Sequence, residues 1–469
     1  MADLETVLIT VAAALAINYL YNQYIHATKD VNELYLNEQS TVDSTRLANE
    51  SAIYKSNKIA YANGLRIGLD IRYDHYKLRH GNLCDVWEII TKYASKSRGS
   101  GITIDNEFQP IIQLNYKISQ FSRYLTSNKV KVVRINLNRF IDNFDILIAV
   151  ISAMVNQITI ELYDDHANLQ DTDEGLFIRP PEVHSTLNEF VNEYTYEKDK
   201  GIALKITRKL NSSVLSTVEF TQLNIISSLA STIKHLPLSK EINHDDKIVV
   251  VQSSKRSNDA ITNQLNKILL SFITTAQLVV LTENSSLSWN NILSHEPTIL
   301  ALNEKELQDL SLEKLKSGLN LNWYKKFVAN QTLVYVNNGI TNPRIFSPAQ
   351  LNEFRCYLSS RLVMEFGYYN IIGPIILTDF YDYRYFSIAS VKSWGCISQS
   401  LELKLTEVSD KSEGKLSVRG YSIGKSTNKV VNRSDQIEQN KNIMKANDGF
   451  MPLINVRGRW GNDGCLYIV

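Results

Sequence analysis

The stretch Lys247–Leu281, KIVVVQSSKRSNDAITNQLNKILLSFITTAQLVVL, decides the fold class. It starts with an apolar β-branched run, Ile248–Val251, continues with a segment of helical periodicity, Asn258–Thr274, and ends with a second apolar run, Leu278–Leu281. Short continuous apolar runs are typical of parallel strands that are buried on both faces, and the segment between them has the length of a crossover helix. The stretch therefore predicts a strand–helix–strand unit of an α/β fold.

The same alternation extends along the chain on both sides of this unit. The further predicted strands are Lys131–Leu137, Thr159–Tyr163, Thr298–Leu300 and Thr332–Val336, and the further predicted helices are Asp142–Asn156, Glu304–Ser317 and Ala349–Met364. From about Gly373 the strands shorten and glycine-containing turns separate them: Leu401–Leu405, Lys415–Val418 and Cys465–Val469. The acidic stretch Asp164–Lys200 and the polar stretch Lys425–Asp448 are predicted to be loops. The pattern predicts a largely parallel sheet covered by helices, followed by a smaller β-rich unit.

Length and composition limit the function classes. The 469 residues suffice for about three domains, and a hydrophobic content of 44% with 21% charged residues supports packed cores and excludes global disorder. Lys and Arg number 50 and Asp and Glu 49, so bulk charge gives no case for a nucleic-acid partner. The four cysteines form no CxxC pair and no metal-ligand spacing.

The N-terminal segment 1–28 is predicted to be a membrane anchor. Its apolar run, residues 7–21, is interrupted only by Asn18, and Tyr19 and Tyr21 at its end together with Tyr24 suit a membrane interface. As a helix of ~1.5 Å per residue the run covers ~22 Å, less than the ~30 Å of a hydrocarbon core. We therefore expect a helix that either spans at its short limit or lies in one leaflet, with the body in the cytosol. The alternative is an ordinary buried helix.

Motifs spread over residues 82–469 support a more specific hypothesis. The most specific of them are Gly414-Lys415-Leu416 with Arg419-Gly420, Asp448-Gly449-Phe450, Gly458-Arg459-Trp460, and Asp463-Gly464-Cys465-Leu466-Tyr467-Ile468-Val469. Phe220-Thr221-Gln222-Leu223-Asn224 and the helices over Asn82–Ala94 and Gln113–Leu125 precede them in the expected order. Together they resemble the motifs of the adenylate-forming (AMP-binding) superfamily, nearest to the long-chain acyl-CoA synthetases.

This resemblance implies an architecture. It predicts two stacked parallel-sheet α/β subdomains and a small β-barrel-like subdomain behind the N-terminal membrane helix. The corresponding boundaries are 29–235 with the acidic loop 164–200, 236–372, and 373–469. The chain ends at Val469, before the mobile C-terminal subdomain whose lysine stabilises the transition state of adenylation in the family, so that catalytic subdomain is expected to be absent.

The resemblance also locates the phosphate loop, and the residues there do not suit it. The family uses a loop of the form Ser-Gly-Thr-Thr-Gly-x-Pro-Lys-Gly, in which small residues let backbone N–H groups approach the anion. The degenerate positions here are Leu210, Asn211, Ser212, Ser213, Ser216 and Thr217. Three glycines are replaced, the lysine becomes Ser216, and the neighbouring Val214 and Leu215 favour a strand over a phosphate-binding turn.

The nucleotide-binding positions of the resemblance are altered as well. The adenine and metal motif Tyr-Gly-x-Thr-Glu corresponds to Phe366, Gly367, Tyr368, Tyr369 and Asn370. An amide replaces the metal carboxylate at Asn370, and amide oxygen is a poorer ligand for Mg²⁺. The ribose-binding aspartate corresponds to Asn455 or Val456, neither of which accepts two charge-assisted hydrogen bonds.

The resulting expectation is a non-catalytic relative with no catalytic residue, no metal and no cofactor. We expect a scaffold or regulator in lipid metabolism, at the endoplasmic reticulum or a lipid droplet, with a protein partner and an acyl or lipid ligand. Tyrosines at 368, 369, 381, 383 and 385 cluster where the resemblance places the adenine and acyl pocket and could line a residual lipid cleft, although core packing is the favoured explanation. The alternatives are a divergent active fatty acid–CoA ligase, and an unrelated α/β interaction protein at a membrane.

Overall fold

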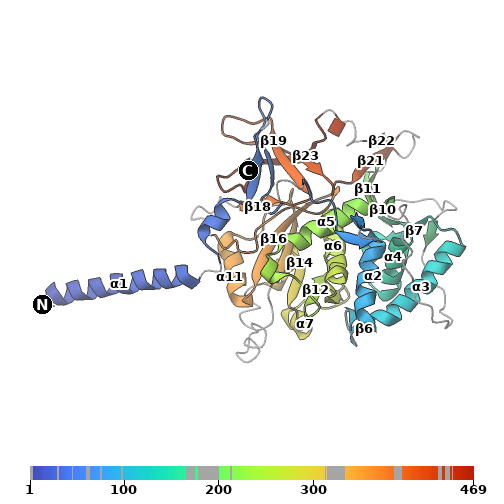
Figure 1. The fold of residues 1–469 in the computed structure, drawn as a ribbon, viewed down its shortest axis with the longest axis horizontal. Helices are drawn as coiled ribbons and strands as arrows, with labels where there is room; N and C mark the ends of the chain where they lie inside the picture. The colour runs from blue at the N-terminus through green and yellow to red at the C-terminus, as the bar shows by residue number, and fades with distance from the viewer. Residues whose placement is uncertain are drawn as a thin grey trace.

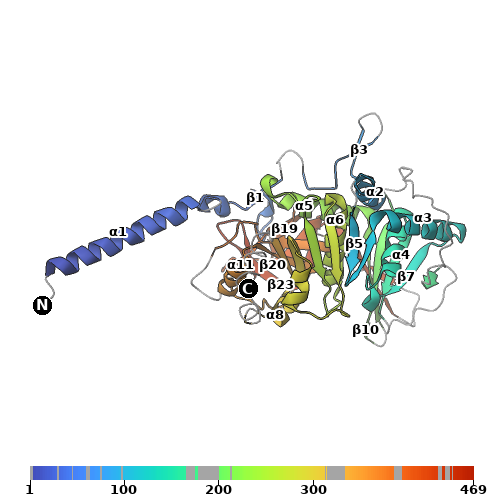
Figure 2. The same ribbon diagram turned by 90° about the horizontal axis from the view of Figure 1, so that it is seen from below.

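The computed structural model describes residues 4–468 except 29–30, 45, 60–63, 74–76, 97–98, 165–174, 178–199, 212–213, 312, 314–332, 385–392, 431–435, 439–443 and 446. A 15-stranded sheet and a 7-stranded sheet form the body, with helices packed between them, and one long helix projects from the body (Figures 1 and 2). The mixed α/β class predicted from the sequence is confirmed.

The centre of the longer sheet is parallel. Its parallel strands are, in spatial order, β5 (Gly101–Ile104), β13 (Gln277–Leu281), β12 (Lys247–Val251), β14 (Ile299–Asn303), β15 (Leu333–Gly339) and β16 (Arg361–Tyr368). The sheet continues antiparallel through β17 (Ile371–Leu377), β18 (Ser393–Ile397), β24 (Leu466–Ile468), β23 (Met451–Trp460), β20 (Gly414–Gly420), β19 (Leu401–Thr406), β2 (Ile53–Ser56) and β1 (Ser40–Asp43), and β6 (Glu107–Pro110) closes the other end. The β-rich C-terminal unit is therefore continuous with the second α/β sheet.

The shorter sheet combines parallel and antiparallel strands. Its order is β22 (Gln436–Glu438), β21 (Lys425–Val430), β11 (Val214–Thr221), β10 (Ile202–Asn211), β8 (Thr159–Tyr163), β7 (Val132–Asn136) and β9 (Gly175–Phe177). A separate two-stranded ribbon pairs β3 (Ile71–Tyr73) with β4 (Lys77–Arg79). Strand pairing crosses two expected boundaries, since β5 and β6 join the second sheet and β21 and β22 join the first.

Five helices fill the space between the sheets: α2 (Leu83–Ala94), α3 (Ile111–Ser127), α4 (Phe144–Val155), α5 (Gln222–His235) and α6 (Asn258–Thr274). α2 contacts both α4, which packs on the shorter sheet, and α6, which packs on the longer one. Asn82 begins α2 with a capping box to Asp85, which satisfies two backbone donors at once. The apolar faces of these five helices form one continuous core. The smaller helices are η1 (Glu33–Asn37), η3 (Leu137–Arg139), η6 (Leu238–Lys240), α7 (Trp289–Ser294), α8 (Glu304–Leu310) and α11 (Pro348–Leu358).

Two sequence-based predictions of secondary structure are wrong. The helix predicted over 349–364 ends at Leu358, where Ser359 takes a left-handed conformation with φ of 47°, and Arg361–Tyr368 forms the central strand β16. The short apolar run in β16 fits a helix or a buried strand equally well by periodicity alone. The polar stretch 425–448 contains β21 and β22 and is not simply a loop, and most of 164–200 lies outside the described residues.

The N-terminal helix α1 spans Leu4–Thr28 and leaves the body at its junction with η1 (Figure 1). Its apolar side chains are exposed on all sides, among them Leu15 at 64% and Ile17 at 67%. The helix itself is confirmed, and the alternative of a helix buried in the core is wrong. In the part of the chain that the structure describes, no helix meets the combination of length and apolar character that a bilayer crossing requires. The predicted spanning form of the anchor is therefore not supported.

Candidate functional site

A cleft of about 880 Å³ opens between the two sheets. The β10–β11 hairpin supplies Arg208, Leu210 and Ser216 to its wall, and the loop before α6 supplies residues 254–259. Tyr369 from the β16–β17 turn and Ile454 from β23 also line it. Segments that are distant in the sequence, at the phosphate, adenine and ribose positions of the resemblance, thus meet at one place in the fold.

The hairpin itself explains why the phosphate position is closed. β11 pairs along one edge with β10, where Arg208 opposes Ser216, and along its other edge with β21, where Ser216 opposes Asn428 and Thr217 opposes Thr427. A strand with neighbours on both edges commits its backbone N–H and C=O groups to the two ladders. Those N–H groups cannot also converge on a phosphate. The two residues at the tip, Ser212 and Ser213, lie outside the described residues.

The side chains of the hairpin confirm this arrangement. Thr217 shares a hydroxyl–hydroxyl hydrogen bond of 3.2 Å with Thr207 on the partner strand, and Leu210 is 61% exposed at the rim of the cleft. Asn211 opposes Val214 beside a register shift at the end of the ladder. A sheet edge with a bulky apolar residue at its rim excludes the close backbone approach that glycines allow in a phosphate loop.

The β16–β17 turn contributes a different aromatic residue from the one predicted. Phe366 is fully buried and packs on Trp394, with ring centroids 4.2 Å apart, so it does not reach the cleft. Tyr368 accepts the backbone N–H of Ile454 at 2.9 Å. The ring that lines the cleft is that of Tyr369, whose phenol pKa is raised by burial. Gly367 is required where it stands, because an added Cβ would lie 2.9 Å from Cβ of Asp259 in α6.

The predicted metal and ribose positions do not line the cleft. Asn370 is fully buried and its amide nitrogen points to the Met451 sulfur at 3.1 Å. Val456 is 2% exposed in the core, and Asn455 is an exposed residue of β23 with φ of 61°. Within the described ranges, no group of three or more His, Cys, Asp and Glu side chains is arranged to bind a metal ion.

A basic loop that sequence reasoning missed forms the other wall. Lys255 is exposed there and Arg256 is buried, donating to Gln252 Oε1 at 2.5 Å and lying 3.3 Å from Glu283. Arg208 reaches across from β10 and donates to Asn258 and to the backbone carbonyl of Arg256. Burial lowers the pKa of both guanidiniums, though arginine remains charged at neutral pH. The position of the loop in the sequence could have identified it. Ligands of parallel sheets bind beyond the carboxyl ends of the strands, and this loop follows the predicted strand that became β12.

The amino terminus of α6 adds to the positive character of the cleft. Its N-cap, Ser257, makes no side-chain cap bond, and Ser257, Asn258 and Asp259 all line the cleft. The first N–H groups of a helix carry partial positive charge and have no partner within the helix. The described lining has three basic side chains and two carboxylates, Asp164 and Asp259. The cleft therefore suits a ligand that has an anionic group and some apolar surface.

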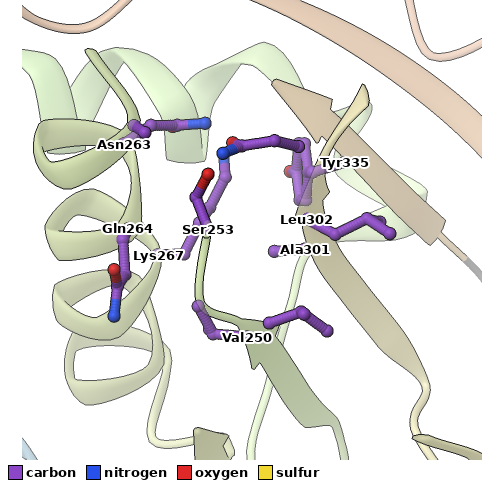
Figure 3. Close-up of a pocket in the computed structure, with 11 residues that line it drawn as sticks. Val250, Ser253, Asn263, Gln264, Lys267, Ala301, Leu302 and Tyr335 are labelled. Atoms are coloured by element: carbon purple, nitrogen blue, oxygen red, sulfur yellow. The ribbon is translucent and has the colours of Figure 1, made fainter. Parts of the chain in front are cut away.

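A buried ion pair lies beside a small cavity lined by Lys267, Asn263 and Tyr335 (Figure 3). Lys267 Nζ lies 2.5 Å from Glu365 Oε1 and 3.7 Å from the centre of the Tyr335 ring, and Asn263 donates to the second Glu365 oxygen at 3.0 Å. Burial lowers the pKa of Lys267, which the neighbouring carboxylate opposes. The cavity that remains between α6 and strands β12, β14 and β15 is about 20 Å³. That volume accepts one water molecule but no acyl chain.

Comparison with known proteins shows which folds this chain resembles. No family model matches the chain. Uncharacterized protein YHR045W of Saccharomyces cerevisiae is 25% identical over an alignment that covers 99% of this chain and 98% of that protein. Among solved structures, o-succinylbenzoate coenzyme A synthetase of Bacillus subtilis has a TM-score of 0.57 at 15% identity, covering 82% of this chain and 77% of its own. The fold resembles that of the adenylate-forming enzymes.

Two further structures support the same similarity. The luciferase-like enzyme of the mealworm Zophobas morio has a TM-score of 0.55 at 11% identity and covers 86% of this chain and 98% of its own. The N-terminal domain of FACL13 of Mycobacterium tuberculosis has a TM-score of 0.55 at 11% identity and covers 83% of this chain and 100% of its own. Identities this low establish a shared fold. The predicted resemblance is confirmed at that level.

Proposed function

We propose that this protein is a non-catalytic relative of the acyl-CoA synthetases that acts as a scaffold or regulator in lipid metabolism. The observation that carries the proposal is the β10–β11 hairpin: at the phosphate position, β11 is paired on both edges with β10 and β21. The burial of Asn370 away from the cleft adds to it, because a metal ligand must reach the bound nucleotide.

The magnitude of these losses argues against adenylation. If the phosphate loop and the metal carboxylate each supply ~3 kcal/mol of transition-state stabilisation, losing both costs ~6 kcal/mol, or roughly 10⁴-fold in rate. Such contributions are not additive, so the figure gives only the scale. At a rate this low the cleft would serve to bind a ligand and not to catalyse adenylation.

The cleft remains suited to an acyl or lipid ligand. Leu137, Leu210 and Ile454 supply apolar surface, and Lys255 with Arg208 supplies positive charge. A ligand of this kind would occupy the space between the two sheets and contact both of them. We propose that a ligand bound in the cleft changes the affinity of the protein for a protein partner.

The nucleotide experiment tests this proposal on the full chain. We expect no ATP–pyrophosphate exchange with fatty acids and no heat of binding for ATP·Mg²⁺, because the paired backbone of β11 offers no nest for the triphosphate. Acyl-CoA is expected to bind, and Lys255→Gln to weaken this binding by roughly fivefold, while Lys129→Gln, just beyond the end of α3, leaves it unchanged. Pyrophosphate exchange that Ser216→Ala and Asn455→Gly abolish would instead identify a divergent active ligase.

We further propose that α1 attaches the protein to a membrane through residues 7–21, with the body in the cytosol at the endoplasmic reticulum or a lipid droplet. Within this run the exposed apolar side chains include Val7, Ile9, Leu15 and Leu20, and they lie all round the helix. An apolar surface with no polar face is stable only when an apolar medium surrounds it.

Leu15→Lys tests the attachment. It replaces an exposed apolar side chain in the middle of α1, so we expect binding to phosphatidylcholine vesicles to weaken by about 2 kcal/mol, roughly 30-fold, in a flotation assay. Leu15→Ile keeps the apolar surface and serves as the matched control. Equal flotation of the Lys and Ile variants would exclude membrane attachment through this helix.

A further inference from the structure

A second hollow lies beside the carboxyl end of α11 and is separate from the cleft. Its volume is about 780 Å³, and three basic side chains line it: Lys240, Arg355 and Arg361. Among the described lining residues there is no carboxylate; the others carry hydroxyl, amide or thiol groups or are aromatic. A wall of this composition attracts an anion that has several hydrogen-bond acceptors.

The basic side chains are held at different depths. Arg355 is fixed by hydrogen bonds from its guanidinium to Asn352 and to the carbonyl of Leu362, the latter at 3.2 Å. Arg361 lies with its guanidinium carbon 5.8 Å from the centre of the Tyr381 ring, and Lys240 is exposed at the end of η6. Asp382, a carboxylate whose charge acts on Arg355, is bound by Arg384 through two contacts of 2.8 and 2.9 Å. The hollow thus keeps positive charge at its base and at its rim.

The hollow adjoins the root of α1. Tyr35 belongs to η1, the first helical turn after α1, and its ring packs edge-to-face on Tyr381 with centroids 6.2 Å apart. Tyr381 is itself part of the hollow's wall, and Figure 1 shows α1 joining the body on the side of α11. A membrane that holds α1 would therefore lie near the hollow.

We infer that this hollow binds the phosphate of an anionic lipid headgroup. The inference rests on the proposed membrane attachment of α1. Guanidinium groups match phosphate oxygens with paired N–H donors, and the hydroxyl of Ser359 offers a further donor. Basic residues close to a bilayer surface also gain from the negative potential of anionic lipids. The apolar helix then supplies attachment, and the hollow supplies selectivity among membranes.

The test compares full-length protein on vesicles of phosphatidylcholine alone and of phosphatidylcholine with phosphatidylserine or phosphatidylinositol phosphate. We expect tighter binding to the anionic vesicles, and Lys240→Gln/Arg361→Gln to reduce that preference by on the order of 30-fold. Lys96→Gln/Lys129→Gln makes the same change of charge just beyond the ends of α2 and α3, two helices that lie far from α1, and is expected to keep the preference. Should the double variant unfold, Lys240→Gln alone tests the exposed member.

The outcomes separate this inference from the attachment of α1. Binding to neutral vesicles measures the attachment through α1, and the additional affinity for anionic vesicles measures the contribution of the hollow. Either proposal can therefore be refuted without the other. An equal loss of preference in the pocket and control variants would show a bulk charge effect and overturn the inference. Saturable binding of soluble glycerol phosphate, as tight as to vesicles and lost in the pocket variant, would assign the site to a free phosphate ester and overturn the lipid source.

Discussion

Glu365→Gln is expected to lower the free energy of unfolding by about 3–5 kcal/mol, because it leaves the Lys267 ammonium buried without its counter-charge. Lys267 is 1% exposed and Glu365 0%, and their contact is 2.5 Å. The second Glu365 oxygen also holds Asn263 of α6, so the carboxylate ties the helix to β16 through two residues. The adjoining cavity of about 20 Å³ has room for one water molecule, which carries no charge to replace the carboxylate.

The pH dependence of the variant gives a second observable. Burial lowers the pKa of Lys267 in the folded protein relative to the usual 10.5, so the folded state binds fewer protons than the unfolded chain in the window between the two values. Stability in this window rises with pH. Without the carboxylate the pKa of Lys267 in the folded protein falls further, so the pH range between the folded and unfolded pKa values extends to lower pH. The loss of stability in Glu365→Gln is therefore expected to be largest near neutral pH and smaller near pH ~10.

Urea denaturation of a matched set of variants measures this effect. Glu407→Gln removes an exposed carboxylate that also pairs with a lysine, Lys415, and is expected to cost less than ~1 kcal/mol. Lys267→Met/Glu365→Gln removes both charges and should recover most of the loss. A Glu365→Gln protein as stable as Glu407→Gln would show that water or local rearrangement compensates the lysine.

The sequence predicted the elements with strong local patterns. The bounds of α6 and of β8 agree with those expected, because apolar periodicity and flanking polar residues define them locally. It did not predict that β21 lies against β11, since this pairing joins residues about 200 positions apart and leaves no local pattern. Nor did it predict the Lys267–Glu365 pair: a lysine within an amphipathic helix is normally assigned to the exposed face.

The sequence predicted the region of the candidate site correctly, but only some of the individual residues that line it. Of the predicted positions, Leu210, Ser216 and Tyr369 line the cleft. Phe366, Asn370 and Val456 are buried in packing that motif alignment cannot reveal. The basic loop with Lys255 and Arg256 matches none of the motifs of the resemblance, and its place in the cleft follows from the end of β12 in three dimensions.

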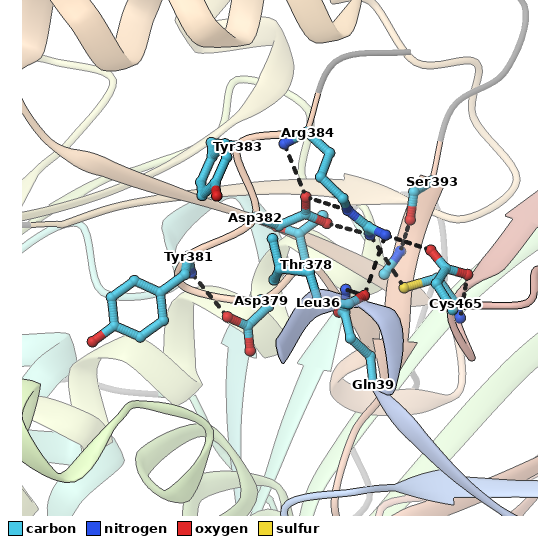
Figure 4. Close-up of polar contacts among 12 residues, drawn as sticks. Leu36, Gln39, Thr378, Asp379, Tyr381, Asp382, Tyr383, Arg384, Ser393 and Cys465 are labelled. Carbon is cyan, nitrogen blue, oxygen red and sulfur yellow. Dashed lines mark hydrogen bonds and ion pairs between the residues drawn. The ribbon is translucent and has the colours of Figure 1, made fainter. Parts of the chain in front are cut away.

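Arg384→Met is the second change expected to have a large effect, about 3–5 kcal/mol of unfolding free energy. Figure 4 shows its guanidinium among two carboxylates: it contacts Asp382 at 2.8 Å and Asp463 at 2.6 Å, and both acids are at least nine-tenths buried. It also donates to the carbonyl of Leu36 at 3.3 Å. Burial alone would lower the pKa of Arg384, but the two carboxylates raise it above its usual value.

The substitution should act both globally and at the root of α1. Removing the guanidinium leaves two carboxylates close to each other and removes one of the hydrogen bonds that hold the Leu36 segment, so amide hydrogen exchange in η1 is expected to accelerate more than exchange in α6. Arg139→Met, which breaks the exposed contact to Asp142, is the control, with an expected cost below ~1 kcal/mol. Adding Asp382→Asn and Asp463→Asn to Arg384→Met removes the uncompensated charges and should restore part of the stability. If exchange in η1 stayed unchanged while global stability fell, Arg384 would serve the C-terminal sheet alone, and Tyr35 packing on Tyr381 would be what holds the helix to the body.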